Sequence, residues 1–219
     1  MKNLIIFYGR TGSTMLYSSL LHHYSMSRGD VSEMHNDNFM NALSYTQSNS
    51  DWSMKMHIDT GITIDRYSNL LEYFIDSEQV DNIYFSYRQD IFDTYLSNII
   101  ARHSDVWNSE TKHEYKTIDT EKSYDILTEC GREMNDTFNR WYFNQNRLHQ
   151  KYNILPISYE QLNITGRVSK DIPVHTTIVK QNSLENKLSL FDNEAVVREC
   201  FWKLLKQWSW DDTGRLRYD

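Results

Sequence analysis

The sequence has few of the residues that mark fibrous, disulfide-rich or membrane-spanning proteins. Among its 219 residues are only 7 glycines, 2 prolines and 2 cysteines, which excludes collagen-like and proline-rich structure. Cys130 and Cys200 lie far apart and without a CxxC pattern, so we expect two free thiols and neither a disulfide nor a metal site. No run approaches the ~18 apolar residues that a membrane-spanning helix needs.

Positive charge is also scarce. The chain has 23 lysine and arginine residues against 30 aspartate and glutamate residues, a net charge of -7. This balance argues against general affinity for nucleic acid or acidic membranes, although it allows a local basic pocket. The first apolar run is short and is interrupted by Arg10, unlike a secretory signal. We therefore expect a cytoplasmic protein whose partners include neither nucleic acid nor membrane.

Apolar runs that alternate with helical patterns indicate an α/β protein. Strands are expected at 4–8, 52–58, 82–88 and 153–159, and helices at 14–26, 65–77, 90–103, 121–151 and 193–208. Asp65 is the expected N-cap of the second helix, and Asp192 or Asn193 that of the last. Such alternation is typical of βαβ units. We predict one domain over residues 1–219, with a parallel sheet of four to five strands flanked by helices.

The stretch LIIFYGRTGST at 4–14 combines a buried strand with a glycine-containing loop that opens a helix. Gly9 and Gly12 allow the backbone to approach a ligand closely, because glycine has no side chain. The first N–H groups of a helix are unpaired and the macrodipole is positive there, which suits an anion such as phosphate. The sequence thus predicts a P-loop-like strand, loop and helix; an ordinary strand-to-helix turn is the alternative.

Polar residues follow three of the predicted strands, where ligands of open parallel sheets bind. The first loop supplies Arg10, Thr11, Gly12, Ser13 and Thr14. Lys55 and His57 alternate on the second strand and therefore share a face. Arg88 ends the third, and Asp93 and Ser97 follow one helical turn apart. Each residue alone is compatible with a structural role, but together they would suit a doubly phosphorylated ligand and a proton transfer.

This combination resembles the sulfotransferase family that uses 3'-phosphoadenosine 5'-phosphosulfate (PAPS). GRTGST at 9–14 fits the family's first signature, and KMH at 55–57 fits its Lys-x-His signature. NIYFSYRQDIFDTYLS at 82–97 fits the signature that binds the 3'-phosphate, and ILPISYEQL at 154–162 fits a strand that runs into Tyr-Glu-x-Leu. The four motifs occur in the family's order and cover most of residues 1–165.

The resemblance implies an enzyme that moves a sulfuryl group from PAPS to a hydroxyl of a small-molecule or glycan acceptor, without a metal. Adenosine 3',5'-bisphosphate would be the product. Arg10 and the backbone at 11–14 would hold the 5'-phosphate and the sulfuryl oxygens, since the guanidinium fork binds two oxygen atoms and stays charged. Lys55 would add positive charge near the sulfuryl group. His57 would accept the proton of the acceptor hydroxyl.

Two features depart from the family pattern. Arg88 and Ser97, which would bind the 3'-phosphate, are nine positions apart, one more than in the common pattern, and the usual proline between them is absent. No segment clearly matches the Arg-Lys-Gly sequence that closes over the donor. The stretch 163–190 is a candidate replacement for it. Its cationic residues are Arg167, Lys170, Lys180 and Lys187.

Two alternatives of other classes stay open. A P-loop nucleotide kinase or NTPase would share the strand, loop and helix, but Ser13 follows Gly12 where GxxxxGK[ST] requires lysine. A nucleotide-binding module without chemistry would keep the first and third signatures and would not need His57. Neither the acceptor nor the oligomeric state follows from the residues.

Overall fold

The protein is described here from a computed structural model, for residues 1–29, 32–34, 38–58, 68–106, 115–175 and 184–219. Its centre is a five-stranded parallel sheet in the order β2-β3-β1-β4-β5. The strands are β1 (Lys2–Phe7), β2 (Glu33–Met34), β3 (Trp52–His57), β4 (Asn82–Tyr87) and β5 (Ile154–Ser158). The predicted α/β fold with a flanked parallel sheet is confirmed. The four expected strands are present, and the fifth, β2, is too short to leave a pattern.

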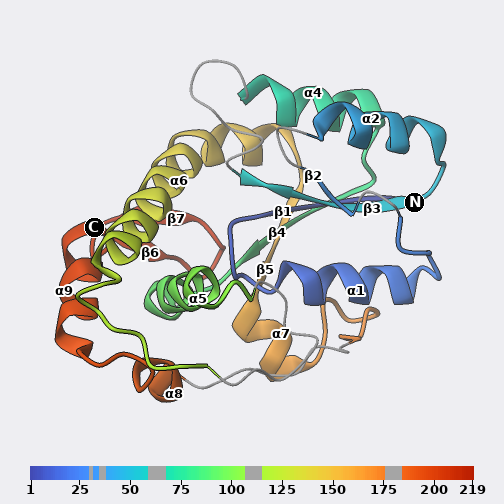
Figure 1. The fold of residues 1–219 in the computed structure, drawn as a ribbon. Helices are drawn as coiled ribbons and strands as arrows, with labels where there is room; N and C mark the ends of the chain where they lie inside the picture. Colours follow the sequence, from blue (N-terminus) through green and yellow to red (C-terminus); the bar gives the residue numbers. More distant parts are fainter. Residues whose placement is uncertain (30–31, 35–37, 59–67, 107–114, 176–183) are drawn as a thin grey trace.

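The strand order brings the motif-bearing strands together. β1 is central, with β3 and β4 on either side, so that Phe7 pairs in register with both His57 and Ser86. The carboxyl ends of these three strands therefore lie at one edge of the sheet (Figure 1). This is the edge at which open parallel sheets bind ligands.

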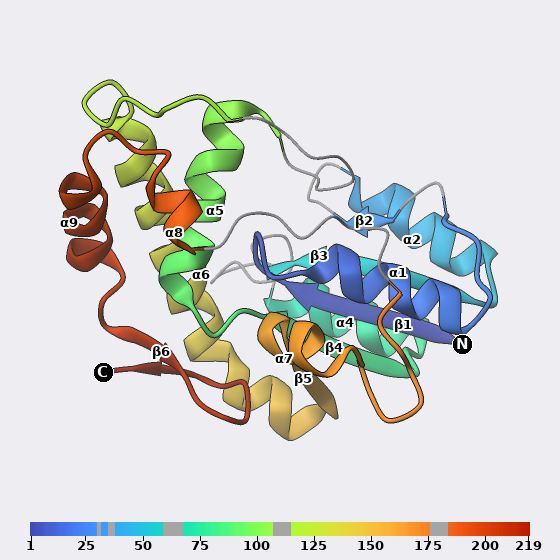
Figure 2. The ribbon, with the colours of Figure 1, turned by 90° about the horizontal axis from the view of Figure 1, so that it is seen from below.

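Helices cover both faces of the sheet (Figures 1 and 2). They are α1 (Ser13–His23), α2 (Phe39–Ser48), α4 (Ser68–Glu78), α5 (Ile91–Ser104), α6 (Tyr124–Lys151), α7 (Tyr159–Thr165), α8 (Leu184–Leu188) and α9 (Glu194–Leu204). Alternate residues of β1 enter two cores: Leu4 and Ile6 pack with the larger one, and Ile5 packs with Leu16 and Leu20 of α1. Burial on both faces explains why the strand has a continuous apolar sequence.

The C-terminal region corrects one prediction. The helix expected at 193–208 ends at Leu204, and Trp208–Trp210 forms strand β6, which pairs antiparallel with β7 (Leu216–Tyr218). Asn193 is the N-cap residue of α9, as one of the two candidates. The expected cap Asp65 lies outside the described residues. Both cysteines are free and buried, as predicted. None of the described helices combines the length and hydropathy of a membrane span.

Candidate functional site

The loop after β1 has an unusual backbone. Arg10 and Gly12 both have positive φ angles, 67° and 79°. Glycine adopts such angles readily, whereas an arginine rarely does. The loop is held from inside: the Thr11 hydroxyl donates to the Tyr8 carbonyl (3.1 Å), and the Ser86 hydroxyl donates to the Thr11 carbonyl (3.0 Å). The buried Thr11 side chain thus bonds to the backbone of its own loop, and strand β4 supports the loop from below.

The start of α1 is open to an anion. Gly12 is its N-cap and supplies no capping side chain, and the first turn contains no acidic residue. Ser13 is buried and Thr14 is exposed. A Cβ atom at Gly12 would lie 2.6 Å from Cδ2 of Tyr159, so the ring of Tyr159 packs against the loop at a position where only glycine fits. This arrangement leaves the backbone N–H groups of the first turn without a side-chain acceptor at the cap.

Arg88 lies directly beyond β4. Its guanidinium group pairs with Asp93, its Cζ atom is 4.3 Å from the ring centre of Tyr159, and its Nε is 3.9 Å from Oε1 of Glu160. That Nε atom is buried and has no hydrogen-bond partner. The Tyr8 hydroxyl bonds to both the N–H and the carbonyl of Arg88, each at 3.1 Å. Arg88 is thereby fixed beside the loop with one donor unused.

Helix α5 brings the third motif together despite its longer interval. The Asp90 side chain caps the helix by accepting from the N–H of Asp93 (2.9 Å), and the Ser97 hydroxyl donates to the Asp93 carbonyl (2.8 Å). Lys187 of α8 donates to Oδ1 of Asp93 (2.5 Å) and to the hydroxyl of Ser97 (2.8 Å). Asp93 and Lys187 therefore connect Arg88 with Ser97. The interval of nine positions between Arg88 and Ser97 does not keep the two residues apart in space.

Lys187 is a residue of this site that the motifs do not identify. It is one of the four cationic residues of 163–190, the candidate segment for closing over the donor. Of the others, Arg167 bonds to the Lys170 carbonyl (2.6 Å) in an exposed turn, and Lys180 lies outside the described residues. Lys187 is only 8% exposed. The sequence gives no indication of this position, because Lys187 of α8 contacts Asp93 and Ser97 of α5, and these two helices are far apart in the chain.

Three cations, the buried Lys187 and the partly buried Arg10 and Arg88, influence one another. Burial lowers the pKa of Lys187 from its ordinary value to about 7; the charges of Arg88 and Arg10 lower it further, and Asp90 opposes them. Burial also lowers the pKa of Arg10, with a further contribution from Arg88. We call Arg10, Arg88 and Lys187 the cation cluster. Like charges held together in a partly buried place favour the binding of an anion.

Lys55 lies beside the start of α1. Its Nζ atom is 2.5 Å from Oε2 of Glu33 and 3.5 Å from the Thr14 hydroxyl, and it lies 5.5 Å from the ring centre of Phe7. Lys55 thus reaches the predicted phosphate loop, but Glu33 pairs with it. Glu33 belongs to the two-residue strand β2, and the sequence around it contains no motif that would have identified it as part of the site. The strand pairing of β2 with β3 is what sets it opposite Lys55.

His57 ends β3 and lines a cavity of about 210 Å³. Its ring packs edge-on against Phe7, with 5.1 Å between the ring centres. The other lining residues come from the first loop and from α5 and α6: Tyr8, Gly9, Asn98, Arg102, Cys130, Glu133, Met134 and Thr137. Arg102 pairs with Glu133. No motif predicts the residues from α5 and α6, since they meet only when the two helices pack together.

Tyr8 connects this cavity with the cation cluster. It lines the cavity, and its hydroxyl holds the backbone of Arg88. The structure therefore places every residue predicted for the site at the same edge of the sheet, in two adjoining parts. In the described residues, no group of three histidine, cysteine, aspartate or glutamate side chains could hold a metal ion.

No protein-family model matches the chain, and comparison with curated proteins and with solved structures also gives no match. The arrangement of the site's own residues is what any functional interpretation rests on.

Proposed function

We propose that this protein is a sulfotransferase that moves a sulfuryl group from PAPS to a hydroxyl of a small-molecule or glycan acceptor. The observation that carries the proposal is the cation cluster beside a helix start with no capping side chain. Two anionic groups of one ligand could be held there at the same time. A histidine in the adjoining cavity accounts for the proton transfer that the reaction requires.

The residues fit the donor nucleotide in two places. The unused, buried Nε of Arg88 and the ammonium group of Lys187, which lies beside the Ser97 hydroxyl, suit the 3'-phosphate. Arg10 and the N–H groups at the start of α1 suit the 5'-phosphate and the sulfuryl oxygens. Asp93 presently accepts from both Arg88 and Lys187. It therefore holds these two cations in place, but its negative charge also weakens their attraction for a phosphate.

The chain's own residues would then assist the transfer in three ways. The loop at 9–14 orients the donor, and Arg10 stabilises the negative charge that develops on its leaving group. Lys55 brings a further positive charge to the side of the helix where Thr14 lies. His57 takes the proton from an acceptor hydroxyl in the cavity next to Gly9. PAPS supplies the sulfuryl group, and no metal ion is needed.

The competing function is that of a P-loop nucleotide kinase or NTPase. One observation favours it: Lys55 of β3 reaches the start of α1 and could replace the lysine that the loop lacks. A triphosphate, however, leaves the cluster of Arg88, Ser97 and Lys187 without an obvious role. A nucleotide-binding module without catalysis would use the same cations and would not depend on His57.

Thermal-shift titration with adenosine 3',5'-bisphosphate, AMP, ADP and ATP with magnesium distinguishes these functions. We expect the bisphosphate to stabilise the protein most, because a charge-assisted hydrogen bond to the 3'-phosphate is worth about 1.5–3 kcal/mol, or roughly 10- to 150-fold in affinity. Arg88→Ala should remove most of this preference and leave weak AMP binding. Ser97→Ala should have a smaller effect, since Lys187 also serves that position. A higher rank for ATP with magnesium would contradict the proposal.

Transfer itself is tested with labelled PAPS and a mixed panel of sugar, phenol, lipid-alcohol and peptide-tyrosine acceptors. We expect the label to move to one acceptor class with release of the bisphosphate. Binding of the bisphosphate without transfer to any acceptor would favour the non-catalytic module.

A further inference from the structure

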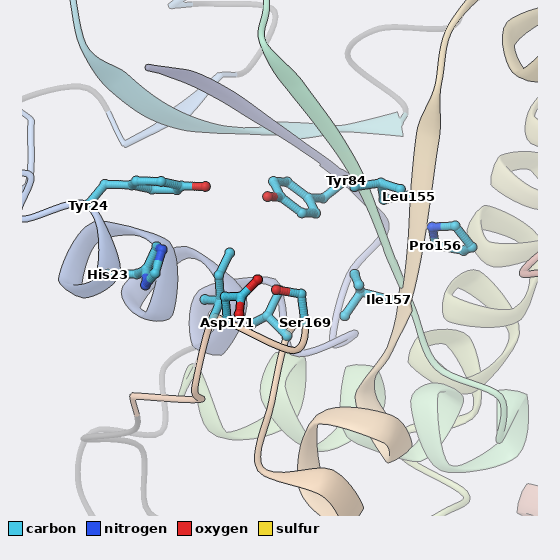
Figure 3. A pocket seen from close by; sticks show the side chains of 10 residues that line it. His23, Tyr24, Tyr84, Leu155, Pro156, Ile157, Ser169 and Asp171 are labelled. Carbon is cyan, nitrogen blue, oxygen red and sulfur yellow. The ribbon is translucent and has the colours of Figure 1, made fainter.

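A second pocket, of about 420 Å³, lies on the α1 face of the sheet, between the end of α1 and the edge strand β5 (Figure 3). Its volume is within the range of small-molecule sites. It is lined by His23, Tyr24, Tyr84, Leu155, Pro156, Ile157, Val168, Ser169, Asp171 and Ile172. The predicted phosphate loop is at the first turn of α1 and this pocket is at its last. Eleven helical residues separate them by roughly 15 Å, so the two sites are distinct.

The walls of the pocket are apolar and aromatic. Ile157, Val168 and Ile172 are buried and belong to the core that packs against α1. Tyr24 and Tyr84 point their hydroxyl ends toward one another across the space (Figure 3). Burial, together with the neighbouring Tyr24 hydroxyl, raises the pKa of Tyr84. Tyr84 therefore remains a neutral hydroxyl at physiological pH, and it can donate or accept a hydrogen bond.

The lining of the pocket contains one acidic side chain and one histidine, His23. Asp171 is the acidic residue of its lining, and none of the lining residues is a lysine or an arginine. Asp171 forms no ion pair in the part of the chain that the structure describes. The C-terminal end of α1 carries the negative end of the helix macrodipole, and the faces of tyrosine rings attract cations. All three features disfavour a carboxylate or phosphate and favour a positive charge.

We propose that this pocket binds a small organic ammonium ion with an apolar or aromatic body. The body would pack against Ile157, Val168 and Ile172, as apolar groups do in preformed pockets. The ammonium group would be held by the Asp171 carboxylate and the tyrosine hydroxyls. This site is independent of the proposed nucleotide site, and its test does not require catalytic activity.

Isothermal titration calorimetry at pH 8 with three probes of similar shape tests the charge preference. The probes are 2-phenylethylammonium, the neutral 2-phenylethanol and the anionic 3-phenylpropionate. We expect the ammonium ion to bind most tightly, by about threefold or more over the alcohol, and the carboxylate to bind most weakly. Equal affinities, or tighter binding of the carboxylate, would overturn the proposal.

Two variants and a matched control assign the binding to this pocket. Asp171 lies at an exposed position. Asp171→Asn should lower the affinity for the ammonium ion to near that for the alcohol, and should leave the affinity for the alcohol unchanged. Tyr24→Leu should weaken both probes by removing an aromatic wall. Asp125→Asn, an exposed position at the start of α6, should change neither. Unchanged ammonium binding in Asp171→Asn, or an equal loss in Asp125→Asn, would refute the assignment.

Discussion

His57 is the side chain whose replacement best separates binding from catalysis. It lines the cavity beside the loop, whereas the cation cluster is held by other residues. We expect His57→Ala to lower turnover by about 10²–10⁴, the usual loss on removing a general base, and to leave the affinity for adenosine 3',5'-bisphosphate nearly unchanged. Single-turnover rates with labelled PAPS and bisphosphate titration measure the two quantities. Full activity in the variant would contradict this role of His57 and would make Glu133, the carboxylate of the same cavity, the candidate base.

Lys187 gives the protein a predictable response to pH. Its pKa in the folded protein is lowered to about 7 from an ordinary value of 10.5. Between these values the unfolded chain binds a proton that the folded chain does not, so this residue makes the free energy of unfolding rise with pH. Below about pH 7 both states are protonated and the contribution stays at its least favourable value. The slope should not exceed about 1.4 kcal/mol per pH unit.

Urea denaturation of the protein and of Lys187→Met at pH 7.5 and 9 measures this contribution. The difference between the two proteins removes the effects of other groups, such as Cys130, whose pKa burial raises to about 11. We expect the variant to lose the part of the increase that Lys187 supplies. Parallel pH dependences of the two proteins would mean that Lys187 keeps an ordinary pKa through its contact with Asp93.

At the scale of elements, the loop between β1 and α1 depends on Gly12. We expect Gly12→Ala to destabilise the protein by about 2 kcal/mol or more, because a non-glycine residue in the left-handed region costs about 1–2 kcal/mol and its Cβ atom would also meet the ring of Tyr159 at 2.6 Å. Gly166→Ala is a matched control: it has a φ of 61° and no atom within 4 Å of its Cβ position. It should show the backbone cost alone. Equal losses would mean that Tyr159 moves away freely.

At the scale of the whole molecule, the C-terminal hairpin supports the site from a distance. Trp210 stacks on Tyr8, with 5.7 Å between ring centres, and Tyr8 in turn holds the backbone of Arg88. The Gln145 side chain on α6 bonds to both the N–H and the carbonyl of Leu216, at 2.8 and 2.7 Å. The last strands are thus connected both to the long helix and to the cation cluster.

Removal of residues 207–219 should therefore affect both stability and binding. Loss of the buried Trp208 and Leu216 side chains alone corresponds to about 3–6 kcal/mol, and the affinity for adenosine 3',5'-bisphosphate should fall as Arg88 loses its support. Urea denaturation and bisphosphate titration measure these effects. Asp212→Asn, at an exposed position in the turn of the same hairpin, should leave both nearly unchanged. A truncated protein with full affinity would show that Tyr8 holds Arg88 without Trp210.

The sequence by itself determined the α/β fold, the four main strands and the edge at which the candidate residues gather. These features follow from apolar periodicity and from glycines at a strand end, which act over a few neighbouring residues. The resemblance to PAPS-dependent sulfotransferases rests on the same local motifs, and the function and the cytoplasmic location stay predictions. The predicted end of the last helix was wrong, because the pairing of β6 with β7 overrides helical periodicity after Leu204.

Only the tertiary structure decided which side chains complete the site. Lys187 joins Asp93 and Ser97 across 90 or more positions of sequence, and Glu33 meets Lys55 through the pairing of a two-residue strand. The cavity at His57 exists because α5 packs against α6, and the pocket near Asp171 because a loop folds back onto α1. Each of these contacts joins distant segments, whose approach depends on the packing of the whole core and leaves no periodic trace in the sequence.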